Sequence, residues 1–466
     1  MNKQRLNKEA LARYKALFEP KSMAVIGVST HNDRHPANVI FNKNRLHYPL
    51  NVYAVNPSGG TFQGEPVYRS VPEIPDKVDL AVIVVRAEQV RRVLADCIES
   101  GVGAGVIISG GFAEVGRGDL QEEIAAVARQ ADFPFLGPNC IGMFSPPYVD
   151  TNFIANERII RPYPGNIALV SQSGGILIDL MIKLTEEGAG LSRAVSIGNK
   201  VLIRELNLLD YFIHDDRTRV IAFYVEGFGK GEGRTFLEAA AKCPKPIIVL
   251  KSGKSPMGTT AVSSHTASLA GDYRVFSAAL AQFGVVEAKN ETELINFCES
   301  LSRYRAPIRG NIGIVTGSGG HGVGAVDLCS AFGLSVPTLP AEAQEELRSR
   351  ISPSIQAIAS LKNPFDLTGS ATDEDFAAAT TYLWSRPEID CVIALLLPYM
   401  PGISMDLGAR LSFVAKQMDK MLVAYVPHVE KYRILTEGFE FNGVPVAHSV
   451  EGAVLMAEAM RRWGQC

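Results

Sequence analysis

Short apolar runs that end in small residues alternate with helix-like stretches along most of the chain. In its first third, such runs predict strands at residues 23–28, 52–55, 80–85, 105–109 and 133–137. Between them, residues 87–100 and 119–131 have the spacing of amphipathic helices. Alternation of this kind is typical of βαβ units that build a parallel sheet.

The same alternation restarts twice further along the chain. Apolar runs predict strands of a second sheet at 167–171, 194–197, 220–225 and 246–250, and of a third at 312–316, 391–397, 422–426 and 444–447. Proline and polar residues without periodicity cluster at 145–165 and again at 305–310. We therefore predict an α/β protein of three tandem doubly wound domains, at residues 1–148, 149–306 and 307–466.

Composition narrows the class of protein. Of 466 residues, 47% are hydrophobic and 20% charged, and the net charge of −3 gives no reason to expect nucleic acid or an anionic membrane as a partner. No apolar run approaches the roughly 20 residues of a membrane span, and the first residues lack the apolar core of a signal peptide. The seven cysteines are scattered without a CxxC pair, which argues against disulfides and structural zinc. We expect a cytoplasmic protein without a metal site.

The first candidate site is the turn after the first predicted strand. Its sequence at 25–29, Val-Ile-Gly-Val-Ser, has the single glycine Gly27 where a dinucleotide-binding unit has GxGxxG. The backbone N–H groups that follow such a strand can still meet a phosphate. From this turn alone, a strand-end glycine without a ligand is the better interpretation.

Two later turns share a different design. Ser-Gln-Ser-Gly-Gly at 171–175 and Gly-Ser-Gly-Gly-His at 317–321 follow strands and precede helices expected at 176–184 and 323–332. Ser173 is a candidate helix cap, and two helix N-termini aimed at one point would attract a dianion such as phosphate. A tight turn with a cap explains 171–175 equally well. We interpret His321 as an exposed or capping histidine rather than a catalytic one.

The segment Ser-Ser-His-Thr-Ala-Ser-Leu-Ala-Gly at 263–271 leaves room around His265 for a bulky, charged reactant. An imidazole is a competent nucleophile toward phosphoryl groups when a carboxylate holds its other nitrogen. Glu226, at the end of the predicted strand 220–225, is a candidate for that carboxylate. A capping histidine and an ordinary surface acid remain the alternative.

Taken in order, these segments resemble the α subunits of ADP-forming acetyl-CoA synthetases, relatives of succinyl-CoA synthetase. The resemblance rests on AVIGVS at 24–29, YAVNP at 53–57, DLAVIV at 79–84, SGGFAE at 109–114, LGPNCIG at 136–142, ALVSQSGG at 168–175, YVEG at 224–227 and SHTASLAG at 264–271. It implies a Rossmann-like CoA-binding domain followed by two flavodoxin-like domains.

The resemblance also implies the reaction acyl-CoA + phosphate + ADP ⇌ carboxylic acid + CoA + ATP, through an acyl phosphate and a phosphorylated histidine. By position that histidine is His265, and Glu226 matches the acid that orients it. The residues that match the two helix N-termini holding the phosphohistidine are Ser173, Gly174, Gly319 and Gly320. Positions that usually line CoA are Gly27, Ser29, Asn56, Pro57, Val85, Phe112 and Asn139.

Nothing in the chain resembles an ATP-grasp domain. The resemblance therefore implies a separate β subunit, in an α2β2 assembly, that binds ADP or ATP with Mg²⁺. The chain departs from its relatives at the loop 32–36, at Ser58 where a lysine is common, and at Ala267 where a glycine is usual. Lys43 or Arg34 are candidates to supply the missing positive charge to the CoA phosphates. Which carboxylic acid is used depends on a pocket shape that the sequence does not reveal.

Three other functions fit parts of this pattern. A non-catalytic regulator of the same ancestry would bind CoA or acyl-CoA without turnover, although His265 and Glu226 are both present. A nicotinamide-dependent dehydrogenase would need the missing GxGxxG fingerprint. A purely structural partner in a complex would not need the carboxylate and histidine pair.

Overall fold

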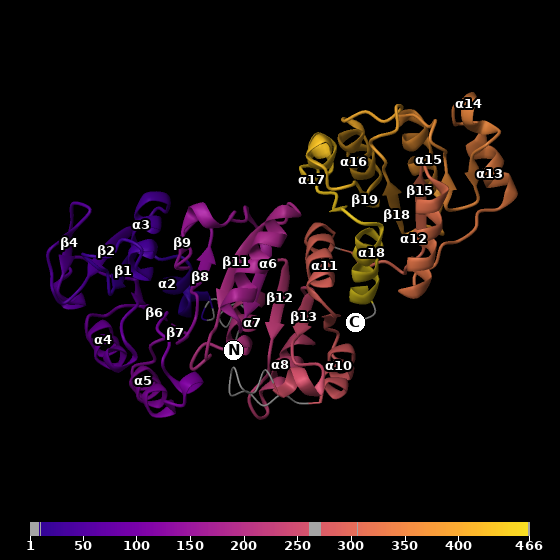
Figure 1. The fold of residues 1–466 in the computed structure, drawn as a ribbon. Coiled ribbons are helices and arrows are strands. Elements are labelled where there is room, and N and C mark those ends of the chain that lie inside the picture. The colour runs from indigo at the N-terminus through magenta and orange to yellow at the C-terminus, as the bar shows by residue number, and fades with distance from the viewer. Residues whose placement is uncertain (1–8, 10, 261–271, 305, 465–466) are drawn as a thin grey trace. The chain divides into compact units, whose positions relative to one another are not determined.

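The computed structural model describes residues 9, 11–260, 272–304 and 306–464, which form two compact units, Met1–Glu287 and Ala288–Cys466. The first unit contains two sheets and the second unit contains one (Figure 1). Among the described residues, no helix is both long and apolar enough to cross a bilayer.

The first sheet has the strand order β3-β4-β2-β1-β5-β6-β7 and is parallel except at its β3–β4 edge. Helix α3 lies on one face, and α4 and α5 lie side by side on the other (Figure 1). The elements of this part are α2 Lys15–Phe18, β1 Ser22–Ile26, α3 Pro36–His47, β2 Asn51–Val55, β3 Thr61–Phe62, β4 Glu65–Tyr68, η1 Val71–Glu73, β5 Leu80–Ile83, α4 Ala87–Glu99, β6 Ala104–Ile107, η2 Ala113–Val115, α5 Gly118–Gln130 and β7 Phe135–Leu136.

The second sheet has the order β14-β13-β12-β10-β11-β8-β9, with β8 and β9 antiparallel at one edge. Its elements are β8 Met143–Ser145, β9 Val149–Asp150, η3 Asn156–Arg158, β10 Pro164–Ser171, α6 Gly174–Glu186, β11 Leu191–Ser196, α7 Glu205–His214, β12 Val220–Val225, α8 Glu232–Ala240, β13 Ile247–Lys251, α10 Tyr273–Gln282 and β14 Val286–Ala288. Buried side chains of both sheets, such as Val25 and Val170, belong to one hydrophobic cluster. This shared core makes the first two sheets a single unit.

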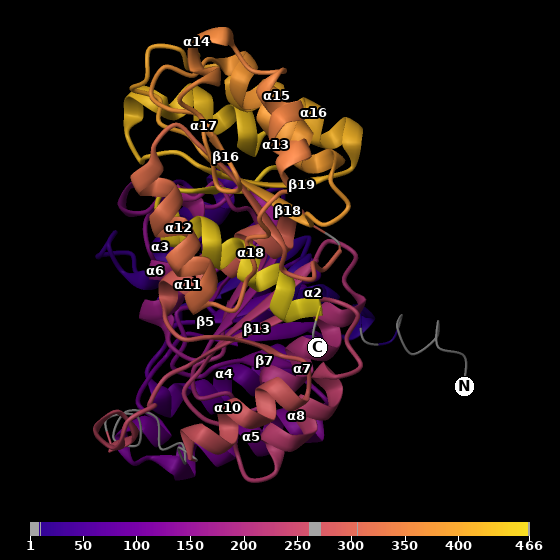
Figure 2. The same cartoon turned by 90° about the vertical axis from the view of Figure 1, so that its right-hand side faces the viewer.

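The second unit is built on a sheet of order β16-β17-β15-β18-β19-β20, again mostly parallel. Helix α18 packs against both α11 and α12 (Figure 2). The elements are α11 Glu291–Arg303, β15 Ile312–Thr316, α12 Gly319–Ala331, α13 Ala341–Arg348, α14 Pro353–Gln356, β16 Ser360–Leu361, β17 Phe365–Asp366, α15 Asp373–Ser385, β18 Cys391–Leu395, α16 Leu407–Met418, β19 Met421–Tyr425, η4 Glu430–Tyr432, α17 Arg433–Glu440, β20 Val446–Ala447 and α18 Val450–Gly464.

Each strand expected from the apolar runs has a counterpart, and the α/β fold of three parallel-rich sheets is confirmed. Two features differ from the sequence pattern. Strands β8 and β9 lie at the edge of the region 145–165 that was expected to be irregular, and they are too short to leave a periodic signal. Helix α12 starts at Gly319 rather than at residue 323, because its first turn is made of glycines that carry no amphipathic pattern.

The three glycine-containing turns follow equivalent strands of the three sheets. Strands β1, β10 and β15 each lie between two parallel neighbours: β2 and β5, β11 and β12, β17 and β18. At such a strand the order of the sheet reverses, so the chain segments that follow the strand and its neighbour run to opposite faces of the sheet. This leaves a crevice at the carboxyl end of the strand. The topology therefore puts Gly27, Ser173 and Gly319 at the positions where doubly wound sheets bind ligands.

Candidate functional site

The seven residues expected to line CoA follow five adjacent strands of the first sheet. Gly27 and Ser29 follow β1, Asn56 and Pro57 follow β2, Val85 follows β5, Phe112 follows β6 and Asn139 follows β7. Since the carboxyl ends of parallel strands share one edge, these residues lie in a row across the sheet. Phe112 differs from the others because it is fully buried in the core.

Gly27 is required by packing whether or not a ligand is bound. Its φ of +106° is a conformation that side-chain-bearing residues rarely adopt, and a Cβ there would lie 2.1 Å from the carbonyl oxygen of Val84. The following loop is held by a reciprocal pair of hydrogen bonds between the backbone of Ser29 and the side chain of Asn38, each 2.7 Å long. The Asn56 side chain donates to the carbonyl of Val28 at 2.9 Å, which joins the β1 and β2 loops.

Glu114 ties the loop after β6 to the loop after β11. One carboxylate oxygen accepts hydrogen bonds from the N–H groups of Gly111 and Phe112, and the other accepts from the Asn199 side chain at 2.6 Å. Burial alone would raise the pKa of Glu114, but these donors outweigh burial and hold the pKa below its usual value. Asn139, in the left-handed region at φ +56°, donates to Asn199 at 3.3 Å. Glu114 therefore acts as an ionised anchor for this end of the row.

The second turn has the geometry of an anion-binding helix start. Ser173 is the N-cap of α6, and its hydroxyl accepts the N–H of Ile176 at 3.4 Å, so the predicted cap is confirmed. A Cβ on Gly174 would come within 3.0 Å of Ile141, whereas one on Gly175 would meet nothing within 4 Å. The backbone N–H groups at this terminus are thus open to a ligand on the Gly175 side.

A cavity of about 330 Å³ joins the second turn to the first sheet. Its walls come from the β6 and β7 loops and from the loops after β10 and β11, and they include Asn139, Gly174 and Lys200. Cys140 also lines it, but burial raises the pKa of this thiol to about 12, so Cys140 is no nucleophile. This cavity, the α6 hollow, therefore contains both Asn139, from one end of the row of candidate CoA-binding residues, and the N-terminus of α6.

Gln172 connects this hollow to Glu226. Its side-chain oxygen accepts the N–H groups of Glu226 at 2.6 Å and Gly227 at 3.1 Å, and its amide nitrogen donates to the carbonyl of Gly227 at 2.8 Å and to Glu205. Lys200, which lines the hollow, forms an ion pair with Glu205 at 2.8 Å and donates to the same Gly227 carbonyl. The end of β12 is therefore held by one buried polar network.

Glu226 itself is only 5% exposed. The Lys251 ammonium donates to its backbone carbonyl at 2.7 Å. Burial lowers the pKa of Lys251, while the Glu226 carboxylate raises it and offsets part of that effect. The candidate carboxylate is thus a buried acid at the carboxyl edge of the sheet, which excludes the alternative of an ordinary surface acid.

Replacing Gln172 with Leu should destabilise the first unit by roughly 2–4 kcal/mol, because two buried N–H groups lose their acceptor at about 1–2 kcal/mol each. Glu205 keeps its ion pair with Lys200 and adds little to this loss. Urea unfolding of the full chain, followed by circular dichroism, measures the change. Gln130→Leu, at the exposed end of α5, is the matched control. Equal unfolding midpoints for the two variants would mean that the network carries no stability.

The third turn lies in the second unit and has a similar design. Gly319 and Gly320 are the first residues of α12; a Cβ on Gly320 would meet nothing within 4 Å, and one on Gly319 would lie 2.8 Å from Asp366 Oδ2. His321 contacts the Ser318 hydroxyl through Nδ1 at 3.1 Å, as expected of a histidine with a local structural role. Convergence of the α6 and α12 N-termini remains a prediction. His265, with residues 261–271, lies outside the described residues.

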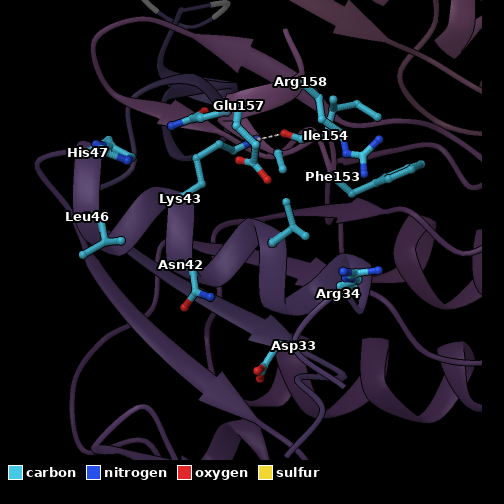
Figure 3. A pocket seen from close by; sticks show the side chains of 13 residues that line it. Asp33, Arg34, Asn42, Lys43, Leu46, His47, Phe153, Ile154, Glu157 and Arg158 are labelled. Atoms are coloured by element: carbon cyan, nitrogen blue, oxygen red, sulfur yellow. Dashed lines mark hydrogen bonds between the residues drawn. The ribbon is translucent and has the colours of Figure 1, made fainter. Parts of the chain in front are cut away.

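Lys43 does not supply charge to a ligand. Its ammonium forms a buried ion pair with Asp150 at 2.9 Å and donates to the backbone carbonyl of Asn152. It also donates to the backbone carbonyl of Ile154 at 3.4 Å (Figure 3). Burial lowers its pKa to about 8, although the Asp150 carboxylate raises it. Arg161 contacts the same carboxylate at 2.6 Å. Of the two cations considered for the CoA phosphates, only the exposed Arg34 is therefore available.

Sequence patterns alone missed several residues of this site. Gln172 lies within the second turn, but the turn's sequence assigns its side chain no role, and no motif includes Asn199, Lys200 or Phe153. A signal for two of them existed, because Gly-Asn-Lys at 198–200 follows the strand β11 as the other turns follow theirs. Lys200 has φ +46°, an unusual conformation that marks a constrained loop.

Three family models match the chain in sequence order. They are a CoA binding domain at residues 21–146, a succinyl-CoA ligase like flavodoxin domain at 164–301 and a ligase-CoA domain at 312–466. Together these models cover most of the three predicted domains.

Curated proteins and solved structures match over similar lengths. Acetate–CoA ligase (ADP-forming) I subunit alpha of Pyrococcus furiosus is 35% identical, with 97% of both chains covered. Acetate–CoA ligase (ADP-forming) I of Archaeoglobus fulgidus is 38% identical over 388 residues, and this chain spans only 54% of its length. The dinucleotide forming acetyl-coenzyme A synthetase 1 of Ca. Korarchaeum cryptofilum, solved with phosphate and ADP, has a TM-score of 0.86, 29% identity and coverage of 97% and 96%.

Proposed function

Because the chain belongs to the family of ADP-forming acetate–CoA ligases and matches their alpha subunits along its length, we propose that it is the CoA-binding catalytic subunit of an NDP-forming acyl-CoA synthetase. The observation that supports this most directly is the hollow shared by Asn139 and the α6 N-terminus. In that hollow, the thioester end of a CoA bound along the first sheet would meet phosphate. The α6 N–H groups and helix dipole suit a phosphate dianion.

The proposed reaction has two steps on this chain. A phosphate oxygen attacks the thioester carbonyl carbon, the C–S bond breaks, and CoA leaves as the thiol with acyl phosphate formed. A nitrogen of His265 then attacks phosphorus, the P–O bond to the acyl group breaks, and the carboxylate leaves. His265 carries the phosphoryl group until ADP accepts it to give ATP.

Glu226 is proposed to orient His265 and to stabilise the positive charge that develops on the imidazole. Its burial and the Gln172 network favour one fixed position at the carboxyl end of β12. Ser173 and Gly174 would hold the phosphoryl group at α6, and Gly319 and Gly320 would provide a second helix N-terminus.

ADP, ATP and Mg²⁺ are proposed to bind a separate ATP-grasp subunit, in an α2β2 assembly. Relatives named subunit alpha support the existence of a partner. The alternative, a regulator that binds CoA or acyl-CoA without turnover, keeps the same first sheet but needs neither His265 nor the Gln172 network.

Two measurements on the full chain test the proposal. Calorimetry should detect binding of CoA and none of NAD, because the Gly27 turn lacks the dinucleotide fingerprint. With the ATP-grasp partner supplied, acyl-CoA, phosphate and ADP should yield ATP, and the chain alone should yield none. CoA binding without any turnover in the presence of the partner would favour the regulator. NAD binding without CoA binding would contradict both.

A further inference from the structure

The α6 hollow has its charge on one side chain. Of the described residues that line it, Lys200 alone is charged, and no carboxylate among them offsets that charge. Cys140 stays a neutral thiol because burial raises its pKa to about 12. The N-terminus of α6, where Gly174 and Gly175 line the same hollow, adds partial positive charge. The electrostatic potential in the hollow is therefore positive, which favours an anionic ligand.

Two acceptors hold the Lys200 ammonium at the wall of the hollow. It pairs with the Glu205 carboxylate at 2.8 Å and donates to the Gly227 carbonyl at 2.6 Å. It also lies 5.6 Å from the centroid of the Phe228 ring, which adds a cation–π contact. An ammonium has three N–H groups, and these acceptors use two of them. One N–H group is left for a further acceptor.

Glu205 neutralises the charge of Lys200 only in part. Glu205 is 2% exposed and is not among the residues that line the hollow, so the ion pair presents its positive end there. The Glu205 carboxylate also accepts a hydrogen bond from the Gln172 amide. In addition, Glu205 is the first residue of α7, where the helix dipole favours an anion. Its negative charge is thus shared among Lys200, the amide and the α7 N-terminus.

Lys43 shows how a lysine with a purely structural role differs. Its ammonium has one carboxylate and two carbonyls as acceptors, from Asp150, Asn152 and Ile154, which use all of its N–H groups. Lys200 has one carboxylate and one carbonyl. Its side chain is 14% exposed, against 3% for Lys43. Lys200 therefore keeps both a donor and an accessible surface for a ligand.

We propose that Lys200 binds the phosphoryl group in the α6 hollow, together with the backbone N–H groups at the α6 N-terminus. The assignment rests on the proposed function, because it takes inorganic phosphate and the acyl phosphate to be the anions of this site. Lys200 donates a hydrogen bond to a phosphate oxygen and takes part in no bond-breaking step. The Gly227 carbonyl accepts from both Lys200 and Gln172, and Gln172 accepts the N–H of Glu226. The phosphate site and Glu226 therefore belong to one hydrogen-bond network.

Inorganic phosphate is the probe in the first measurement. In calorimetry on the full chain, Lys200→Met should raise the dissociation constant for phosphate about tenfold to a hundredfold, since a hydrogen bond to a charged group contributes that much. Lys183→Met, at a partly exposed ion pair on α6, is the matched control and should bind phosphate like the wild type. With the ATP-grasp partner, acetyl-CoA and ADP, Lys200→Met should raise the KM for phosphate by a similar factor and leave the KM for acetyl-CoA unchanged.

Glu205→Gln distinguishes a charge that binds phosphate from a charge that only holds the fold. The amide keeps an acceptor for Lys200 but removes the negative charge beside it, so phosphate should bind about threefold more tightly or better than to the wild type. A purely structural ion pair would be broken in both variants, and both would then bind phosphate more weakly. Should Lys200→Met fail to fold, the direction of the change in Glu205→Gln decides the assignment by itself.

Each other result overturns the assignment or the function beneath it. Unchanged phosphate binding in Lys200→Met, or no phosphate binding by the wild-type chain, would remove Lys200 from the anion site. Weaker binding of free CoA by Lys200→Met than by Lys183→Met, with phosphate binding unchanged, would assign the lysine to a phosphate of CoA instead. Phosphate binding that depends on Lys200, in a chain that yields no ATP with its partner, would contradict the proposed function and leave the anion site in place.

Discussion

His265→Ala is expected to abolish the labelling of the chain by acyl-CoA and labelled phosphate. The proposed carrier bond joins phosphorus to an imidazole nitrogen, and no other side chain is assigned that role. The wild-type chain, incubated without ADP or partner, should become labelled through a bond that is stable to base and labile to acid, as a phosphoramidate is. Adding ADP and the partner subunit should transfer the label to ATP.

Labelling rates of further variants distinguish the residue that carries the phosphoryl group from the residue that orients it. Glu226→Gln should still become labelled but about 100-fold more slowly, because the carboxylate that orients and stabilises the imidazole is lost. His214→Ala, which removes a histidine near Asp210 on α7, is the matched control and should label like the wild type. Undiminished labelling of His265→Ala would show that the phosphoryl group is carried elsewhere. Unchanged rates in Glu226→Gln would remove that residue from the mechanism.

The second large effect concerns stability. Asp150→Asn is expected to lower the free energy of unfolding by about 3–5 kcal/mol, because it leaves buried cations without their counter-charge. Asp150 is fully buried and pairs with Lys43 at 2.9 Å and with Arg161 at 2.6 Å. Its backbone is also bonded to the Asn44 side chain, so this cluster ties α3 to β9. Urea unfolding at pH 7 measures the loss.

The pH dependence of that loss tests its electrostatic origin. The pKa of Lys43 is about 8 in the folded protein, below its ordinary 10.5, and removing Asp150 lowers it further. Folded Lys43 therefore loses its proton at a lower pH in the variant than in the wild type, where it keeps the proton up to about pH 8. The difference in stability between wild type and variant should therefore shrink as the pH rises toward 8 and stay constant above it. Asp132→Asn, at the exposed Arg13 pair, should cost at most about 1 kcal/mol at any pH. A pH-independent loss in Asp150→Asn would point to packing instead of charge.

The architecture and the positions of the turns were readable from the sequence because both have local causes. A strand buried on both faces is a run of apolar residues, and a turn that brings backbone to a ligand needs glycine at a set place after it. The runs at 23–28, 167–171 and 312–316 and the glycines behind them therefore predicted the central strands β1, β10 and β15. Ser173 as the α6 cap followed from the same local chemistry.

Contacts between distant segments carry no such local signal. The side chain of Gln172, after β10, accepts the N–H of Glu226 at the end of the neighbouring strand β12. The sequence Ser-Gln-Ser-Gly does not reveal this contact. The sequence leaves Lys43 available for CoA, whereas the fold pairs it with Asp150, 107 residues later in the sequence. The sequence alone does not say whether Gly27 is a glycine because a ligand approaches it or because the fold leaves no room for a side chain. The structure shows that there is no room, since a Cβ would collide with the carbonyl oxygen of Val84 whether or not a ligand binds.

The sequence by itself thus determined the fold class, the order of elements and the turns that surround the candidate site, since each depends on residues near one another along the chain. Only the tertiary structure decided which side chains meet there. The α6 hollow takes its walls from the loops after β6, β7, β10 and β11. Cavity shape and charge balance arise where two sheets pack together, and no single segment encodes that packing.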